Sequence, residues 1–436
     1  MKKMMRGLAG LAVAATLLAG CSDPGAETAT NESVEWPAQD ADLSGTRLTI
    51  WAAQNSNAIP DSVVAGFEEL TGAEVEVETI PDPYEQSVQT KVATGDKPDL
   101  AFWQPTASQL TALNAKNNLL PLDDAPFVDS YSSELRDITG ILDGTRYATL
   151  ISTPAVEGVY YNKEVFAEAG ISDLPTDWAS FVELGRELDR KGITPFYEMA
   201  GDRWATQWWV QVQLAEAAKD GLWDRVNANE EKFTDATIQG AIDTYKELID
   251  DGLFNDDIKT ATFEDQGAAL LAGDAAMVIQ VNSFFSQLQT LAETEELNEK
   301  IGFFPISAEG NIGTFIPDQS NALVAFKTGD ADREAAARQL LSYWMGDGYE
   351  EFVNAQSTVS LQDGVETPAD VPEALLAVSD SLADSAGSMQ ALAIANPDLY
   401  IFLADMIQGT KSTKDVAKAT QDQFAELAKA QGADGF

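Results

Sequence analysis

The first part of the chain alternates between strand-like and helix-like spacing of its apolar residues. In chain order we expect strand 47–52, helix 60–70, strand 73–80, helix 84–94 and strand 99–103. In the second strand Val75 and Val77 alternate with glutamates, so we expect both valines to face inward. This order of elements predicts a parallel sheet with helices on its faces, in which ligands bind beyond the carboxyl ends of the strands.

After about residue 160 the apolar spacing becomes mostly helical. Thr176 or Asp177 is expected to cap a helix that buries Phe181, Leu184 and Leu188. Further helices are expected at 204–218, 234–251, 263–272, 331–345 and 399–429, and further strands at 275–281, 301–304 and 322–326.

The N-terminus has the pattern of an export signal. Basic residues precede a run of small and apolar residues at 8–19, too short to span a bilayer, which predicts a signal peptide over residues 1–20. The run ends in Leu-Ala-Gly-Cys, which resembles the bacterial lipobox, and Cys21 is the only cysteine of the chain. We therefore expect lipidation of Cys21, a flexible tether over residues 21–44, and anchoring to the outer face of the cytoplasmic membrane.

Composition narrows the possible chemistry. The chain has no histidine, which excludes a Ser-His-Asp triad and the usual histidine-ligated zinc sites. Its formal net charge is −44, so we expect no nucleic-acid partner. We also expect no catalytic residues, no metal and no cofactor.

Five segments, in order along the chain, resemble the family-1 extracellular solute-binding proteins of ABC importers, the group that includes maltose-binding protein. They are Gly-Asp-Lys-Pro-Asp-Leu-Ala-Phe-Trp at 95–103, Gly-Val-Tyr-Tyr-Asn-Lys-Glu-Val-Phe at 158–166, Leu-Pro-Thr-Asp-Trp-Ala-Ser-Phe at 174–181, Leu-Ala-Gly-Asp-Ala-Ala-Met-Val-Ile at 271–279, and the helix start at 409–419.

The resemblance implies an α/β, type II periplasmic-binding-protein-like fold: two hinge-linked lobes with parallel or mixed sheets and helices on both faces. We expect residues 45–153 and 318–358 to form the N-terminal lobe, and residues 154–317 and 359–436 the C-terminal lobe. It further implies a monomer that captures a sugar or oligosaccharide and delivers it to ABC permease subunits.

A sugar presents apolar ring faces and a rim of hydroxyls, so its site needs aromatic side chains together with carboxylates, amides and cations. On strand ends and on the resemblance we expect ligand contacts from the following residues: Gln54, Asn55, Trp103, Glu157, Arg203, Trp204, Asn282, Phe284, Phe285, Asp398 and Tyr400. The phenylalanines stand where the family commonly has a tryptophan.

Two other functions stay open. The acidic charge would suit a polyamine or another cation bound by the same fold, although no cluster of carboxylates beside aromatic residues is visible in the sequence. A surface glycoside hydrolase would need a pair of carboxylates that sequence alone does not reveal.

Overall fold

The computed structural model describes residues 36–53, 61–81, 84–131, 135–136, 140–317 and 321–436. The predicted signal peptide, Cys21, most of the predicted tether, and Gln54 and Asn55 lie outside the described residues. Residues 36–44 form neither helix nor strand, but Gln339 donates hydrogen bonds from Nε2 to the carbonyls of Gln39 and Ala41.

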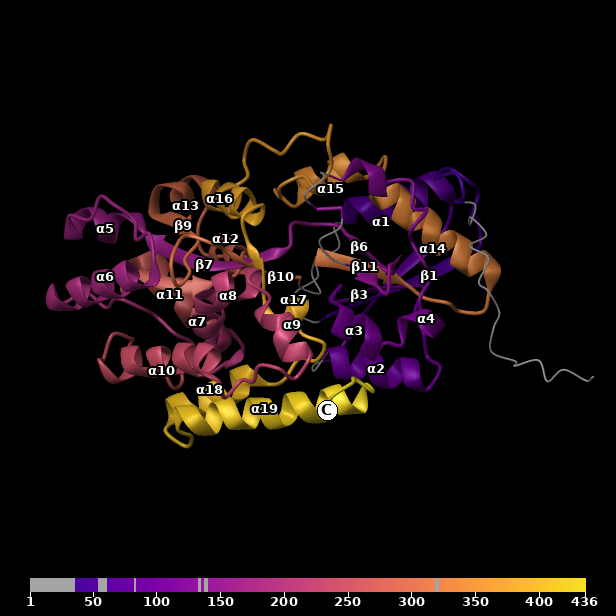
Figure 1. The fold of residues 1–436 in the computed structure, drawn as a ribbon. Helices are drawn as coiled ribbons and strands as arrows, with labels where there is room; N and C mark the ends of the chain where they lie inside the picture. Colours follow the sequence, from indigo (N-terminus) through magenta and orange to yellow (C-terminus); the bar gives the residue numbers. More distant parts are fainter. Residues whose placement is uncertain (1–35, 54–60, 82–83, 132–134, 137–139, 318–320) are drawn as a thin grey trace, which may run out of the picture. The chain divides into compact units, whose positions relative to one another are not determined.

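The first sheet has five strands in the order β2-β1-β3-β11-β6 (Figure 1). Its strands are β1 (Arg47–Ala53), β2 (Glu74–Ile80), β3 (Leu100–Phe102), β6 (Ala148–Leu150) and β11 (Ala322–Ala325). Strands β2 and β3 both run parallel to β1, as the sequence predicts, whereas β11 is antiparallel to β3 and to β6.

Helices and one small hairpin complete the lobe around this sheet. They are α1 (Asp61–Thr71), α2 (Tyr84–Ala93), α3 (Ala107–Ala112), α4 (Ala115–Asn118), η1 (Val128–Ser130), α14 (Ala331–Trp344) and α15 (Tyr349–Ala355), with the hairpin β4 (Ile141–Leu142) and β5 (Thr145–Arg146). One expectation for this lobe is wrong: Val75 is buried, but Val77 is 42% exposed. Strand β2 lies at the edge of the sheet, where a side chain has fewer neighbours to cover it.

A buried carboxylate fixes the start of β3 against its neighbours. Oδ2 of Asp99 accepts hydrogen bonds from the Thr49 amide and from Arg333 Nη2, each at 2.8 Å. The Pro-Asp pair of the first family-like segment therefore has a structural role in joining β1, β3 and α14.

The second sheet is centred on β7 (Ala155–Asn162), which is antiparallel to β8 (Met277–Gln280), β9 (Ile301–Phe304) and β10 (Thr314–Ile316); β12 (Ala386–Gly387) pairs in parallel with β10. The helices of this lobe are α5 (Lys163–Ala169), α6 (Trp178–Arg190), η2 (Trp204–Gln207), α7 (Trp208–Gln211), η3 (Val212–Leu214), α8 (Ala215–Lys219), α9 (Leu222–Asn227), α10 (Ala236–Asp250), α11 (Phe263–Ala272), α12 (Ser283–Gln289), α13 (Thr294–Lys300), α16 (Glu373–Leu382), α17 (Met389–Leu392), α18 (Leu399–Gln408) and α19 (Thr413–Ala430).

Helix α6 begins as the sequence predicts. Asp177 is its N-cap, and the side chains of Asp177 and Ser180 bond each other's backbone amides in a capping box. Phe181, Leu184 and Leu188 are buried. Trp178 is 8% exposed, and its ring packs 5.2 Å from that of Phe181, so it belongs to the core.

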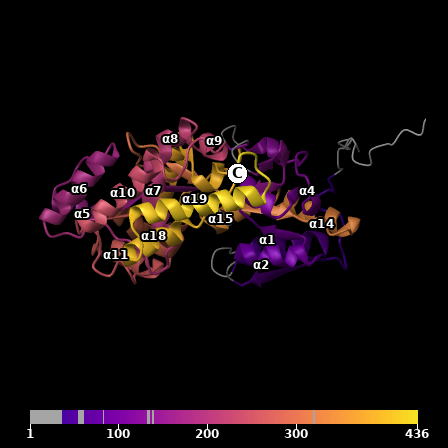
Figure 2. The same ribbon diagram turned by 60° about the horizontal axis from the view of Figure 1, so that its bottom comes forward.

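Two long helices expected from the sequence are interrupted in the structure. Residues 204–218 form the short helices η2, α7, η3 and α8, because packing of the large aromatic side chains overrides a continuous α-helix. Residues 399–429 divide into α18 and α19, since Gly409 (φ 86°) ends α18 and Ser412 caps α19. Helix α19 contacts both α10 and α18, as both views show (Figures 1 and 2).

The chain passes between the two sheets three times: between β6 and β7, between β10 and β11, and between α15 and α16. The first two passages are neighbours, because β6 pairs with β11 and β7 pairs with β10. Asn321 joins them: its carbonyl accepts from the Ile151 amide, and its Nδ2 donates to Ser152 Oγ and to the Thr153 carbonyl. The exact lobe boundaries stay a prediction.

Candidate ligand-binding site

The N-terminal lobe contributes the residues that follow β1 and β3, whose carboxyl ends lie at one edge of the sheet because the two strands are parallel. The residues after β1, including Gln54 and Asn55, lie outside the described part of the chain. After β3 come Trp103 and Gln104. Gln104 is half-buried, and its Nε2 donates to Glu85 Oε1 of α2 at 3.3 Å. The side chains of Gln104 and Glu85 therefore lie at this edge of the sheet, and neither was among the expected contacts.

Trp103 has no exposed surface in this structure. Its indole N–H donates to the Gln109 carbonyl at 3.1 Å, and its ring lies 6.3 Å from that of Tyr84. The Tyr84 hydroxyl in turn donates to the carbonyl of Phe102 at 2.7 Å, which fixes the end of β3 to α2. Stacking of Trp103 on a ligand would require this ring to be uncovered, and it stays a prediction.

The C-terminal lobe contributes a tight turn that carries Arg203 and Trp204. Arg203 is exposed and has a positive φ of 69°, a conformation that residues other than glycine rarely adopt. At Gly201 a Cβ atom would lie 2.5 Å from the Ala261 carbonyl oxygen, so only glycine fits there. Asp202 Oδ2 accepts from the Phe263 amide at 2.7 Å, which ties the turn to α11.

The ring of Trp204 is half-buried and supported on two sides. It lies 5.2 Å from the ring of Phe263 and 6.3 Å from that of Trp208. Trp208 is almost fully buried, as expected for a core residue that shares a face with Trp204. A partly exposed indole on a rigid aromatic base can stack on the apolar face of a ligand.

Helix α18 brings Asp398 and Tyr400 to the same region. The Asp398 carboxylate accepts from Gln423 Nε2 at 2.6 Å, and the Tyr400 carbonyl accepts from Thr206 Oγ1 at 3.0 Å, which joins α18 to η2. Burial raises the pKa of Tyr400, the charges of Asp398 and Glu85 raise it further, and Arg203 lowers it. Tyr400 therefore lies within electrostatic reach of charges from its own lobe and of Glu85 from α2.

The remaining expected contacts lie elsewhere, along β7 and after β8. Phe284 and Phe285 are buried, and their rings pack 5.5 and 6.4 Å from that of Tyr160, so in this structure they are core residues. Asn282 Oδ1 accepts from the Val156 amide at 2.9 Å, which holds the start of β7. Phe284 also packs 5.8 Å from the ring of Phe263, which in turn supports Trp204.

Glu157 is fully buried on β7, and neither of its carboxylate oxygens has a hydrogen-bond partner among the described residues. Burial raises its pKa well above the ordinary value. Across the sheet it faces Thr314 of β10, whose hydroxyl is also without a partner in the described structure.

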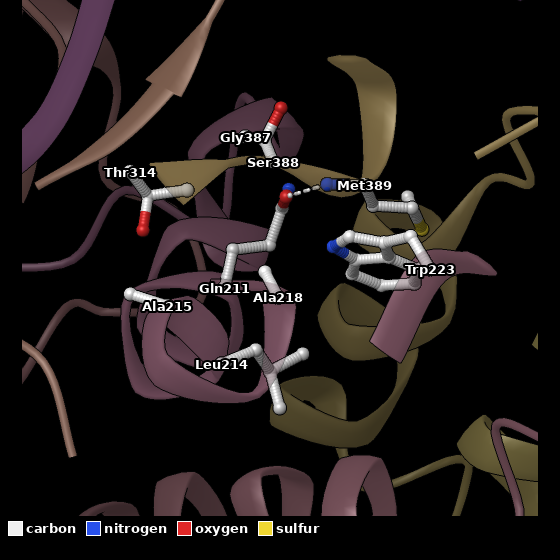
Figure 3. Close-up of a pocket in the computed structure, with 9 residues that line it drawn as sticks. All are labelled: Gln211, Leu214, Ala215, Ala218, Trp223, Thr314, Gly387, Ser388 and Met389. Atoms are coloured by element: carbon white, nitrogen blue, oxygen red, sulfur yellow. Dashed lines mark hydrogen bonds between the residues drawn. The ribbon is translucent and has the colours of Figure 1, made fainter. Parts of the chain in front are cut away.

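Thr314 lines a narrow gap between the second sheet and helices α7 to α9 (Figure 3). Its other lining residues include Gln211, which accepts through Oε1 from the Met389 amide, and the ring of Trp223. The space is too narrow for even a water molecule, so it is a gap in the packing.

Other kinds of site find little support in the described part of the chain. No three acidic or sulfur-bearing side chains come together there as metal ligands would. None of the helices described has the length and apolar composition that crossing a membrane requires.

Comparison with known proteins agrees with this architecture. Residues 52–351 match a model of the bacterial extracellular solute-binding proteins. The osmoprotective compounds-binding protein GgtB of Synechocystis is 26% identical over 196 residues, 43% of this chain and 46% of the relative. The alpha-glucosides-binding periplasmic protein AglE of Rhizobium meliloti is 30% identical over 267 residues, 57% of this chain and 55% of the relative. The chain therefore spans about half the length of these two relatives.

Solved structures share the fold over almost their whole length. A chitin oligosaccharide binding protein superposes with a TM-score of 0.74 at 21% identity, covering 88% of this chain and 99% of the other. The sugar-binding protein MalE of Xanthomonas citri gives a TM-score of 0.66 at 18% identity, covering 89% and 98%. These likenesses confirm the predicted two-lobe, type II periplasmic-binding-protein fold. The chain belongs to the bacterial extracellular solute-binding proteins.

Proposed function

We propose that this protein captures a sugar or short oligosaccharide between its two lobes and delivers it to an ABC permease. The observation that supports the proposal is the surroundings of Tyr400. The charges of Asp398, Glu85 and Arg203 act on its hydroxyl, and its backbone bonds to Thr206 of η2, the short helix that begins with Trp204. Aromatic faces with a few charged or amide groups are what a hydroxyl-rich ring requires.

The ligand class that we favour is an α-glucoside. AglE, the most identical of the relatives described above, is named for alpha-glucosides. In our proposal Trp204 and Tyr400 stack on ring faces, Asp398 and Glu85 accept from sugar hydroxyls, and Arg203 donates to them. Gln54 and Asn55, which follow β1 in the sequence, and Trp103, which follows β3, complete the site when the lobes close on the ligand.

We also propose the anchoring and the lobe boundaries expected from the sequence. Cys21 would carry the lipid on the outer face of the cytoplasmic membrane, and the protein would act as a monomer. The lobes would comprise residues 45–153 with 318–358, and residues 154–317 with 359–436. Labelling with radioactive palmitate tests the anchor, since Cys21→Ser should abolish incorporation and Cys21 is the only cysteine.

A second candidate ligand is a polyamine. Two carboxylates near the Tyr400 ring would favour a cation stacked on an aromatic face, and the strongly acidic chain would attract it. Arg203, the cation that acts on Tyr400, opposes this alternative, because it would repel an amine.

A melting-temperature screen separates these ligands, because a molecule that binds only the folded protein stabilises it. We expect a rise with maltose, trehalose or sucrose and none with spermidine. A rise with spermidine alone would contradict the sugar proposal, and the absence of any rise across a wide saccharide panel would do the same.

The stacking role of Trp204 is testable by calorimetry with the saccharide that binds. Trp204→Ala should weaken binding by about 2 kcal/mol, roughly 30-fold, if the ring behaves like other aromatic anchors. Trp36→Ala is the matched control, because Trp36 is also half-buried but packs on Phe127 in the first lobe. Equal affinities for the two variants would show that Trp204 does not contact the ligand.

A further inference from the structure

Another buried carboxylate, that of Glu198, lies just before the turn that carries Arg203 and Trp204. Glu198 is 1% exposed, and both of its carboxylate oxygens accept hydrogen bonds. Oε1 accepts from the Met199 amide at 2.7 Å, and Oε2 accepts from the Tyr245 hydroxyl of α10 at 2.9 Å. This side chain was not among the ligand contacts expected from the sequence.

The backbone of Glu198 is also held on both sides. Its amide donates to Asn255 Oδ1 at 2.8 Å, and its carbonyl accepts from Asn255 Nδ2 at 3.2 Å. Asn255 Nδ2 donates at the same time to Asp257 Oδ1 at 2.7 Å. Glu198 is therefore fixed in position before the turn begins.

A short chain of hydrogen bonds connects this carboxylate with the turn. The Met199 amide bonds to Glu198, and the Met199 carbonyl accepts from the amides of Asp202 and Arg203 at 3.1 and 3.3 Å. Arg203 has a positive φ, which costs free energy and persists only where the surrounding bonds hold it. Met199 is therefore bonded both to Glu198 and to the turn.

The charged and titratable groups around Glu198 are few. Helix α10 supplies Tyr245, and α7 supplies the uncharged indole of Trp209, which stacks 5.6 Å from the Tyr245 ring. Asp257 lies beyond Asn255 and accepts from the Tyr197 hydroxyl, while Asp265 and Asp274 act on the same tyrosine. No cation is among the groups that bond to Glu198 in the described structure.

Burial without a cation has a clear effect on the carboxyl group. It raises the pKa of Glu198 to about 7, against the opposing effect of the hydrogen bonds from Met199 and Tyr245. The ordinary pKa of a glutamate is 4.5, so Glu198 ionises near neutral pH only while its carboxyl group is shielded from water.

We propose that Glu198 is a positioning residue of the binding site, which holds the turn at residues 199–204 in its binding conformation and makes that conformation sensitive to pH. The part that concerns ligand affinity rests on the proposed function. The part that concerns the turn itself does not.

The direction of the effect follows from proton linkage. Opening of the turn lets water reach Glu198 and returns its pKa towards 4.5, so the open form releases a proton that the closed form keeps. The closed turn is therefore most favoured below pH 4.5, and it loses this advantage as the pH rises towards about 7.

Hydrogen exchange of the ligand-free full chain tests the turn directly. In the wild type, protection of a peptide covering residues 199–206, corrected for the intrinsic pH dependence of exchange, should fall on the order of tenfold between pH 5 and pH 7. Glu198→Gln, which keeps an oxygen acceptor but cannot ionise, should keep protection at every pH. Glu198→Ala should lose protection at every pH.

The matched control is Glu247→Gln, because Glu247 is an exposed carboxylate two residues from Tyr245 on α10. It should behave like the wild type. Two results would overturn the proposal. One is protection that does not change with pH in the wild type, and the other is protection that falls with pH in Glu198→Gln as much as it does in the wild type. If Glu198→Ala does not fold, the comparison of wild type with Glu198→Gln still decides.

Maltose serves as the probe for the second measurement. Its dissociation constant should rise with pH in the wild type and in Glu247→Gln, and it should stay constant in Glu198→Gln. If no protein binds maltose, maltose is not the ligand of this site, while the exchange result still judges the role of Glu198. If maltose binds equally at every pH although exchange changes, the turn does not shape the site and the positioning role is wrong.

Discussion

Two glutamates of the C-terminal lobe, Glu157 and Glu198, are both buried but differ in the hydrogen-bond partners of their carboxylates. Glu157 on β7 faces the Thr314 hydroxyl, and neither of its oxygens has a partner in the described structure. Glu198 receives hydrogen bonds at both oxygens and at its backbone. Burial raises the pKa of both, but only for Glu198 do hydrogen bonds oppose the increase, and they leave its pKa at about 7.

The difference shows how the surroundings of a buried acid decide its role. A carboxyl group without partners has the full cost of desolvation, so it favours the protonated form and contributes nothing to the positions of its neighbours. A carboxyl group with several donors orders the groups that donate to it. Glu198 therefore stabilises a particular turn, whereas Glu157 is a local weakness in the sheet.

The largest effect that we expect is from Glu198→Ala. It leaves the Tyr245 hydroxyl and the Met199 amide without an acceptor and opens a cavity, which together should cost about 3–5 kcal/mol of stability. Thermal unfolding at pH 6 measures it. Glu198→Gln keeps the acceptor and should lose much less, and equal losses in the two variants would contradict the importance of these hydrogen bonds.

The opposite sign is expected from Glu157→Met, which fills the same space without a polar group. Removing a buried carboxyl that has no partner should stabilise the protein by about 1–3 kcal/mol at pH 7. The pKa of Glu157 is raised in the folded state, so its contribution to stability is fully present below pH 4.5 and is lost as the pH rises. The gain from Glu157→Met should therefore grow with pH, and melting temperatures between pH 4 and pH 8 test it.

A smaller gain in stability is expected from Arg203→Gly, because glycine adopts a positive φ without strain. We expect a stabilisation of about 1 kcal/mol together with weaker saccharide binding, since the guanidinium is lost. Arg203→Lys is the control that keeps the charge and the strain. Unchanged affinity in Arg203→Gly would remove Arg203 from the proposed site.

The smallest effect should come from a surface ion pair. Lys418 and Asp422 lie one turn apart on α19, and both side chains are mostly exposed. Lys418→Ala should change stability by less than about 0.5 kcal/mol. A larger loss of stability, measured in the same thermal unfolding experiment, would mean that the free energies expected for Glu198→Ala and Glu157→Met do not apply to this protein.

The elements whose signals are local were predictable from the sequence. Asp177 caps α6 as expected, β9 covers residues 301–304 as expected, and α11 ends at Gly273 because that glycine has a positive φ. These features depend on neighbours in the chain, and a single sequence contains that information.

Features that depend on distant neighbours were predicted less well. The stretch 204–218 has helical spacing but forms four short helices, since its tryptophans pack on α6, α10 and α11. Trp103 follows a strand end as expected, yet it is fully buried, with Gln109 of α3 and Tyr84 of α2 against its ring. Whether a tryptophan ring is buried depends on helices that are distant in the sequence, and the residues next to the tryptophan do not specify them.

The ligand contacts expected from the sequence stay predictions. Arg203 and Asp398 both act on the pKa of Tyr400, and so does Glu85, which was not expected there because it comes from α2, far away in the sequence. Gln104, which bonds to Glu85, was not expected either. Glu198 had one signal that was available: it is a lone carboxylate in the otherwise apolar stretch at 195–200. An acid in such a stretch is buried with the residues around it, and its partners Tyr245 and Asn255 lie about fifty residues away.

The bridge made by Asn321 has a mechanical consequence. Its backbone and side chain together bond to three consecutive residues of the first passage, Ile151, Ser152 and Thr153. Sliding the chain at Asn321 along the chain at Ile151 to Thr153 would break all three hydrogen bonds at once. At this point the two stretches of chain are therefore expected to move as a unit.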